Sequence, residues 1–336
     1  MLEKIRESMD DEDVETLVLT DESNITYALG QKASGYVFIT ADRVEVIASK
    51  FYRYSLQDYE VEYADSRADF RQLLEQKLER MENVAADSLS GTLEEYDVEQ
   101  TDLVKECRTV KTQEEIQKIR EACRVTTENI ENLRETLFTG LTEWEAVSQL
   151  TEFYAERGVG SSFVTQEGYD LVHRNCLSPH RDPRADTVEE DDLVIVDTGC
   201  RNDLYCSDVT RTFCENPSEG QKKLFEDVKD IQASILEMVE PGVELKELDK
   251  RMNRMVEEKG YSTEKNVLHL LGHSVGTEVH EKPSIHSESE RKLEKNMVMA
   301  IEPAIYVEDL GGVRIEDTVL ITENGCERLS TPQISL

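Results

Sequence analysis

The sequence predicts an α/β (α+β) protein with a small N-terminal domain and a larger C-terminal domain built from two similar halves. Two observations lead to this prediction. Short β-type segments precede an amphipathic helix in the first third, and a pattern of helix, turn, helix and β-rich stretch then occurs twice. The 336 residues suffice for two domains with hydrophobic cores. We expect the domains to be residues 1–108 and 109–336.

The N-terminal domain is expected to contain a small sheet and a helix. VETLVLT (14–20), YVFIT (36–40) and RVEVIAS (43–49) predict short strands separated by polar turns. RADFRQLLEQKLERM (67–81) predicts an amphipathic helix, because its apolar residues recur on one side. No catalytic constellation is evident in this domain.

Capping boxes mark helix beginnings in the C-terminal domain. Thr112 with Glu115 opens a helix that we expect to end near Gly140. A second box at Thr142 opens a helix that we expect to stop at Gly158.

Two stretches of this domain, 137–158 and 238–260, resemble each other. The same interval separates both pairs of glycines that mark their turns and ends: Gly140 and Gly242, and Gly158 and Gly260. A constant offset is typical of an internal duplication, although two helical hairpins with generic caps would be the alternative. We favour duplication. Each copy is followed by a predicted hairpin, with turns at Gly199–Asp203 and at Asp309–Gly312.

Four carboxylates stand in these hairpins where apolar residues are expected. They are Asp197 and Asp208 in the first hairpin and Glu302 and Glu316 in the second. A buried carboxylate is costly unless it is paired or bound to a metal, and neighbouring carboxylates repel each other, so a cation is the simplest explanation. A salt-bridge network with Arg211 and Arg314 is the structural alternative.

The stretch HLLGHSVGTEVHEKP (269–283) holds three of the six histidines. Its glycines and β-branched residues disfavour a helix. In a strand, the odd spacing of His273 and His280 places the two histidines on opposite faces. Four carboxylates with His273 make an oxygen-rich set that suits two Mn²⁺, Co²⁺ or Fe²⁺ ions better than structural zinc. Two such ions about 3.5–4 Å apart activate water and polarise a carbonyl, which is hydrolase chemistry. His280 and His180 could stabilise an oxyanion or shuttle a proton, or be ordinary histidines.

The charge balance limits the class of partners. Lys and Arg number 38 against 72 Asp and Glu, a net charge of -34 that repels nucleic acid and anionic membranes. No long apolar run and no signal-peptide pattern is found, and the seven cysteines form no C-x-x-C pair, so a reducing, cytoplasmic location is expected. The negative charge is typical of a protein that functions in concentrated salt, but it could also be an acidic surface with no special habitat. Because the acidic residues are spread along the whole chain, we favour the first interpretation.

Five segments, in order, carry a family resemblance: IVDTG, SDVTRTF, GHSVGTEVHE, AIEPAIY and VRIED. They resemble the metal-site motifs of the pita-bread metallopeptidases, the group of methionine aminopeptidase, Xaa-Pro aminopeptidase and Xaa-Pro dipeptidase (prolidase). VETLVLTDESNITYALG (14–30) is similar to the N-terminal domain of the creatinase and prolidase branch, and KTQEEIQKIREAC (111–123) to its linker helix. The resemblance implies duplicated, pseudo-twofold α/β halves around a curved antiparallel sheet. Relatives with this N-terminal domain are commonly homodimers.

The resemblance also implies a role for each site residue. The ligands of two divalent ions, with manganese favoured and cobalt, iron or zinc as alternatives, would be Asp197, Asp208, His273, Glu302 and Glu316. His180 and His280 would contact the substrate and stabilise the tetrahedral intermediate, and Glu302 would also transfer a proton. His269 and Arg314 would line or orient the substrate pocket. A hydroxide bridging the metals would hydrolyse the bond before proline in short peptides.

Ser284, in HEKPSIHS, departs from the prolidase pattern. Many prolidases carry an arginine there, suited to a dipeptide's free carboxylate, so the serine favours an aminopeptidase that takes longer peptides. Creatinase-like or lyase-type chemistry on a small non-peptide molecule and a non-catalytic interaction module are the alternatives. The five intact ligands argue against creatinase chemistry itself and against a non-catalytic module, whereas lyase-type metal-dependent chemistry stays open.

Overall fold

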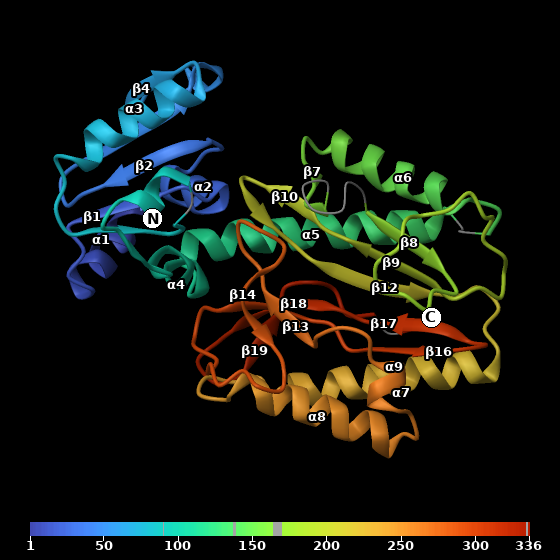
Figure 1. The fold of residues 1–336 in the computed structure, drawn as a ribbon. Helices are drawn as coiled ribbons and strands as arrows, with labels where there is room; N and C mark the ends of the chain where they lie inside the picture. The colour runs from blue at the N-terminus through green and yellow to red at the C-terminus, as the bar shows by residue number, and fades with distance from the viewer. Residues whose placement is uncertain (90, 137–138, 164–169, 334) are drawn as a thin grey trace. The chain divides into compact units, whose positions relative to one another are not determined.

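The structure is a computed structural model that describes residues 1–89, 91–136, 139–163, 170–333 and 335–336 (Figure 1). The chain divides into two compact units, Met1–Arg108 and Thr109–Leu336. Leu137 and Phe138, which begin the first repeated stretch, lie outside the described residues.

The first unit is built on a six-stranded sheet in the order β4-β3-β2-β1-β5-β6. Its strands are β1 (Thr16–Leu19), β2 (Gly35–Ile39), β3 (Val44–Ser49), β4 (Glu60–Ala64), β5 (Val84–Ala86) and β6 (Glu99–Gln100). β1, β2 and β3 are antiparallel neighbours, whereas β4, β5 and β6 each join in parallel. The three strands predicted from sequence are confirmed as β1, β2 and β3.

Helices cover both faces of this sheet. They are α1 (Leu2–Asp11), α2 (Glu22–Leu29), α3 (Arg67–Leu78) and α4 (Leu103–Thr109), with 3₁₀ turns η1 (Lys50–Tyr52) and η2 (Gly91–Glu95). In β1, Leu17 and Leu19 join the core cluster of α1, α2 and α4, while Val18 packs with residues of α3. Because successive side chains of a strand point to opposite faces, a strand covered on both sides is apolar throughout. The helix predicted over 67–81 is confirmed as α3.

In the second unit, helices lie on both sides of the strands (Figure 1). They are α5 (Gln113–Glu135), α6 (Glu143–Glu156), α7 (Glu219–Leu236), α8 (Leu245–Glu258) and α9 (Thr263–Asn266). α5 and α6 cover one side, and α7 and α8 the other. Both predicted capping boxes are present, at the beginnings of α5 and α6. α5 ends at Glu135, earlier than the predicted Gly140.

The strands between these helices form antiparallel sheets. The three-stranded sheet β12-β9-β8 belongs to the first half, and the five-stranded sheet β14-β13-β15-β18-β19 to the second. The strands are β8 (Leu171–Arg174), β9 (Val194–Thr198), β12 (Val209–Phe213), β13 (Gly272–Ser274), β14 (Glu281–Ile285), β15 (Val298–Ile301), β18 (Asp317–Ile321) and β19 (Cys326–Arg328). Smaller sheets pair β7 (Gly160–Ser161), β10 (Cys200–Asn202) and β11 (Tyr205–Cys206), and β16 (Ala304–Val307) with β17 (Gly311–Arg314).

The repeated stretches occupy matching positions. Gly140 and Gly242, before α6 and α8, have φ values of 90° and 93°. Each donates its backbone N–H to the segment before a central strand, Gly140 to Val188 O at 3.0 Å before β9 and Gly242 to Leu293 O at 2.8 Å before β15. The same local geometry therefore occurs once in each half, as duplication predicts.

The first turn lies later than the predicted Gly199–Asp203, of which only Asp203 belongs to it. β10 and β11 extend the hairpin, and the chain reverses at Asp203 and Leu204, which have φ values of 44° and 74°. A leucine rarely adopts positive φ, so the sequence gives no turn signal there. Gly199 serves another purpose, because a Cβ at this position would lie 2.0 Å from Ser207 O. The second turn lies at 308–310, one residue earlier than predicted.

None of the helices in the described part of the chain is both long and apolar enough to cross a membrane. The seven cysteines are free.

Candidate metal centre

Strand ends bring the predicted acidic residues together. Asp197 lies in β9 opposite Thr210 of β12, and Asp208 lies directly before β12 instead of within it. Glu302 follows β15 immediately. Glu316 lies between β17 and β18, and its backbone N–H donates to Thr210 O at 3.1 Å. The two hairpins therefore meet at their carboxylates.

His273 completes the cluster from β13, which pairs with β15. Its Nε2 lies 3.4 Å from Asp208 Oδ2 and 3.5 Å from Glu302 Oε1. Three overlapping groups have candidate ligand atoms within 4.8 Å of one another: Asp208, His273 and His280; His273, Glu302 and Glu316; and Asp197, Asp208 and Glu316. All five predicted ligands thus occur in one constellation, with His280 beside them.

This concentration of carboxylates is electrostatically unfavourable by itself. Burial, and then the neighbouring carboxylates, raise the pKa of Asp208 and that of Glu316 well above their ordinary values. Burial, followed by the charge of Glu316, raises the pKa of Glu302 to about 8. Burial and mutual repulsion thus disfavour full ionisation of the group, and a bound cation would relieve both effects.

The unsatisfied atoms also fit metal ligation. Among the described residues, Asp208 Oδ1 and His273 Nε2 are buried side-chain atoms without a hydrogen-bond partner. His273 Nδ1 lies 3.1 Å from the carbonyl oxygen of Ser274, so the proton is assigned to Nδ1 and the Nε2 lone pair faces the carboxylates. Carboxylate oxygens with one imidazole suit divalent ions such as Mn²⁺ and Co²⁺.

A salt-bridge network explains only part of the cluster. Arg314 pairs through Nη2 with Asp197 Oδ2, and its Nε lies 3.1 Å from Thr210 Oγ1. Arg211, the other predicted cation, donates from Nη2 to Asp317 Oδ1 at 2.7 Å instead. Within the described residues these contacts leave Asp208 without an arginine partner, so they do not replace a metal there.

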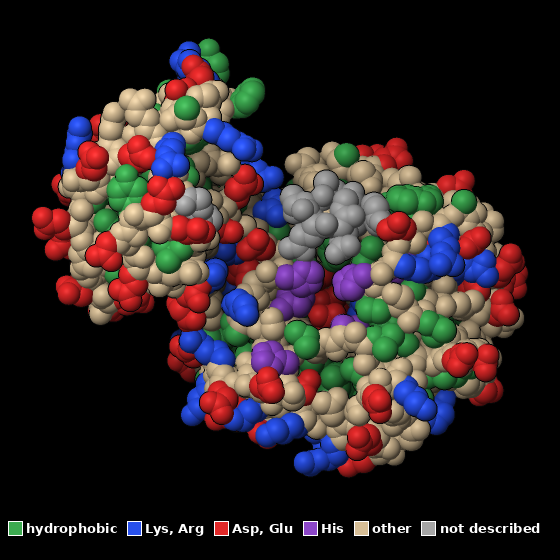
Figure 2. All heavy atoms as spheres, viewed as in Figure 1, with side chains coloured by type: hydrophobic (Ala, Val, Ile, Leu, Met, Phe, Trp, Pro, Cys, Tyr) green, Lys and Arg blue, Asp and Glu red, His purple; other side chains and the backbone are tan. Residues whose placement is uncertain are grey.

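A cavity of about 200 Å³ opens above the carboxylates. It is lined by Phe163, His180, Asp197, Asp208, His269, Leu270, Gly272, His273, His280, Ser284, Glu302, Arg314 and Glu316. Figure 2 shows histidine side chains gathered around a hollow with acidic side chains inside it. All nine predicted site residues, and Ser284, therefore border one space.

The histidines are arranged differently from the expected strand. The chain folds back between β13 and β14, and the rings of His273 and His280 lie edge to face with centroids 4.3 Å apart, not on opposite faces. Part of the His280 ring faces solvent, but the protein packed around the rest, and then His273, lower its pKa to about 4. His269 Nε2 lies 3.3 Å from the hydroxyl of Tyr306, and burial followed by the charge of Arg314 lowers the pKa of His269 to about 3. His269 and His280 are neutral at pH 7.

Comparison with protein families shows to which family the chain belongs. The sequence model of metallopeptidase family M24 matches residues 117–323, and that of the creatinase/prolidase N-terminal domain matches residues 1–122. The first match alone spans more than half of the chain. The chain belongs to metallopeptidase family M24.

Relatives of this M24 metallopeptidase match it along its whole length. The Xaa-Pro dipeptidase of Pyrococcus furiosus is 31% identical over 358 residues, covering 100% of this chain and 99% of the relative. A prolidase structure from Pyrococcus horikoshii has a TM-score of 0.86 at 29% identity, covering 99% of this chain and 98% of its own. The X-Pro aminopeptidase structure from Thermotoga maritima has a TM-score of 0.84 at 27% identity, covering 97% of this chain and 98% of its own. The predicted fold, a creatinase-type domain followed by a pita-bread domain, is confirmed.

Two residues of the M24 centre were not anticipated. The Thr210 hydroxyl lies 2.9 Å from Asp197 Oδ1 and 2.7 Å from Glu316 Oε2, so it joins carboxylates of both halves. Tyr306 contacts both His269 and Arg314. Alternation along a strand could have indicated Thr210, because it is two residues from Asp208.

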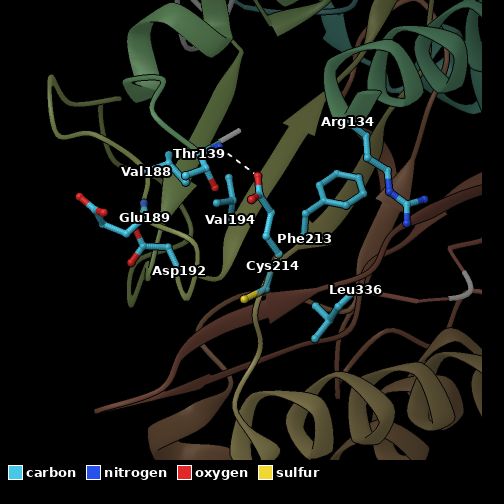
Figure 3. A pocket seen from close by; sticks show the side chains of 10 residues that line it. Arg134, Thr139, Val188, Glu189, Asp192, Val194, Phe213, Cys214 and Leu336 are labelled. Carbon is cyan, nitrogen blue, oxygen red and sulfur yellow. Dashed lines mark hydrogen bonds between the residues drawn. The ribbon is translucent and has the colours of Figure 1, made fainter. Parts of the chain in front are cut away.

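A second cavity of the M24 metallopeptidase, about 240 Å³, lies apart from these residues (Figure 3). Val188, Val194 and Phe213 give it apolar walls, and Arg134 stands at its edge. Across it, the backbone N–H of Thr139 donates to Glu215 Oε1 at 3.2 Å. None of the nine predicted site residues lines this second cavity.

Proposed function

We propose that this metallopeptidase hydrolyses the peptide bond that precedes proline. The observation that supports the proposal best is a set of four carboxylates and one imidazole, with orphaned ligand atoms, at the bottom of a cavity. Two divalent ions, manganese by preference, would be held by Asp197, Asp208, His273, Glu302 and Glu316. When bound, such ions supply an activated water and polarise the scissile carbonyl.

The remaining residues of the site bind and orient the substrate. His280 is a neutral imidazole with one N–H, and from the rim of the cavity it donates a hydrogen bond to the carbonyl oxygen as negative charge develops there. His180, which also lines the cavity, contacts the same region of the substrate. Glu302 carries a proton on its carboxylate to the leaving nitrogen. His269 and Arg314 form the wall that orients the substrate.

Substrate length is proposed from Ser284. Among the described lining residues, Arg314 is the one cation, and it is engaged with Asp197, so no free cation faces a dipeptide's terminal carboxylate. Serine leaves room for a chain that continues beyond proline. We therefore favour an Xaa-Pro aminopeptidase, although curated relatives include Xaa-Pro dipeptidases.

The wider setting is proposed on sequence grounds. We assign residues 1–108 to a creatinase/prolidase-like domain and residues 109–336 to the catalytic domain. A cytoplasmic location without nucleic acid or membrane partners is proposed from the charge and the cysteine content. A homodimer is proposed from the resemblance to relatives with this N-terminal domain.

A substrate panel tests the proposal. Release of the N-terminal residue is measured for Ala-Pro, Ala-Pro-Ala and Met-Ala-Ser, with Mn²⁺ or Co²⁺, at low and molar salt. We expect cleavage of Ala-Pro-Ala, weaker or no cleavage of Ala-Pro, and none of Met-Ala-Ser. No cleavage of any peptide while metal is demonstrably bound would reject the peptidase proposal, and preference for Ala-Pro would reject the interpretation of Ser284.

A further inference from the structure

Lys111 is a buried cation behind the metal centre. Its side chain is 1% exposed, and it precedes α5. Its Nζ donates to Ser274 Oγ at 2.7 Å and to Thr109 O at 3.3 Å, and lies 3.4 Å from Glu281 Oε2. These partners lie next to His273 and His280, although Lys111 lines no part of the cavity itself.

The contact with Ser274 acts on His273. Ser274 follows His273 in β13, and the pairing of β13 with β14 shifts register between these two residues. At this irregular point the carbonyl of Ser274 accepts from His273 Nδ1, while the hydroxyl is held by Lys111 and donates to Val298 O at 3.2 Å. Fixing Ser274 therefore fixes the ring orientation that directs Nε2 towards Asp208 and Glu302.

The contact with Glu281 acts on His280. Glu281 follows His280, and its Oε1 accepts from Thr277 N at 2.8 Å and from Glu278 N at 3.3 Å. The carboxylate fills the space above Gly276, where a Cβ would lie 2.4 Å from Oε2. The loop from 276 to 280 is thus folded around a carboxylate whose charge Lys111 balances.

We propose that Lys111, Ser274 and Glu281 form a positioning cluster that holds His273 in ligating orientation and His280 beside it. The proposal rests on the proposed metal function of His273. A buried ion pair contributes little net stability, because desolvation offsets the attraction, so this cluster is better explained by what it orients. Groups that orient a metal ligand change metal affinity or activity about 10–100-fold when removed.

Three variants and one control test the cluster. K111M removes the charge, K111M/E281Q removes both charges, and S274A removes the hydroxyl alone. K259M is the control, since Lys259 likewise pairs with carboxylates, those of Asp227 at 3.1 Å and Asp230 at 2.9 Å, on the α7 and α8 side of the unit. Each protein is assayed for Co²⁺ dissociation constant without substrate, urea unfolding of the metal-free form, ¹⁵N imidazole signals, and kcat/KM.

We expect K111M to raise the Co²⁺ dissociation constant and lower kcat/KM by at least about tenfold. K111M/E281Q regains unfolding stability but not metal affinity, S274A shows a smaller loss of affinity, and K259M changes stability alone. Co²⁺ affinity within about twofold of wild type in K111M, or its recovery in the double variant, would show that the cluster is only structural. If K111M does not fold, the Co²⁺ affinities of S274A and of K111M/E281Q test the cluster instead.

The readouts separate this inference from the proposed function. A wild type that binds Co²⁺ but cleaves no peptide rejects the proposed activity and leaves the affinity test intact. The ¹⁵N signals of His273 and His280 in the metal-free protein report the tautomer and the hydrogen bonding of each ring, including the contact of His273 Nδ1 with Ser274 O. Signals unchanged in K111M and S274A overturn the cluster whatever the enzyme cleaves.

Discussion

His173 illustrates how burial sets the charge of a single residue. It lies in β8 with 1% of its surface exposed, and its Nε2 is 2.5 Å from the carbonyl oxygen of Arg181. Burial, and then the charge of Arg181, lower its pKa from 6.5 to about 4. The folded protein therefore keeps a neutral imidazole at a pH where the unfolded chain carries a proton.

The stability consequence has a definite sign. The contribution of neutral His173 is fully present above about pH 6.5, falls with decreasing pH, and is lost below about pH 4. Between pH 8 and pH 5 we expect wild type to lose about 2 kcal/mol more stability than H173N, measured by urea unfolding of the metal-free proteins. The comparison with H173N removes the contribution of the carboxylates, because these titrate in both proteins. Equal pH dependence in the two proteins contradicts the assignment.

At the scale of elements, the glycines that precede α6 and α8 have a conformational function. Gly140 and Gly242 both have positive φ, and a Cβ at either position would meet no atom within 4 Å. Substitution by alanine therefore introduces backbone strain without a clash. Because the two positions are related by the repeat, both substitutions should have the same effect.

We expect G140A and G242A each to cost about 1 kcal/mol in urea unfolding. G140N and G242N should cost less, because asparagine tolerates positive φ better. A large cost at one position and none at the other would contradict their equivalence.

Elements with local signals were predictable, and those with distant causes were not. The capping box of α5 lies within four consecutive residues, Thr112 to Glu115, and its chemistry is readable there. Lys111, one residue earlier, looks like an ordinary surface lysine, because its partners Ser274 and Glu281 lie 163 and 170 residues away.

The candidate site shows the same limit. Asp197 and Glu302 were found because each ends or interrupts an apolar run, an anomaly visible in one segment. Asp208 and Glu316 were found because they follow in the returning strands of the same predicted hairpins. Thr210 gave no such anomaly, since threonine is common in strands. That Thr210 joins Asp197 to Glu316 depends on two hairpins meeting in space.

At the scale of the whole molecule, the net charge of -34 is the dominant feature. Repulsion among carboxylates destabilises a compact state. Salt weakens this repulsion, because the Debye length, the distance over which exposed charges interact, falls to about 3 Å at 1 M ionic strength. The surface does contain compensating pairs, such as Arg120 with Glu327 and Lys295 with Glu323, but exposed pairs contribute little. Screening by dissolved salt should therefore stabilise the folded chain more than these surface ion pairs do.

We expect the urea midpoint to rise when KCl increases from about 0.1 M to about 2 M, with a gain of at least about 1 kcal/mol in the free energy of unfolding. Metal-free and metal-loaded proteins are compared, so that the acidic surface is separated from the metal centre. A midpoint that is independent of salt, or falls with it, would favour a merely soluble acidic surface.

Peptide hydrolysis by this chain should depend on metal ions that the clustered carboxylates hold. Equilibrium dialysis of the metal-stripped chain against Mn²⁺, with hydrolysis of Ala-Pro-Ala measured on the same samples, tests this dependence. We expect two ions per chain for wild type, with activity that follows occupancy. For D208N we expect fewer than two ions and activity at least about a hundredfold lower. Wild type without bound Mn²⁺, or D208N with full occupancy and activity, would show that the carboxylates do not hold a catalytic metal.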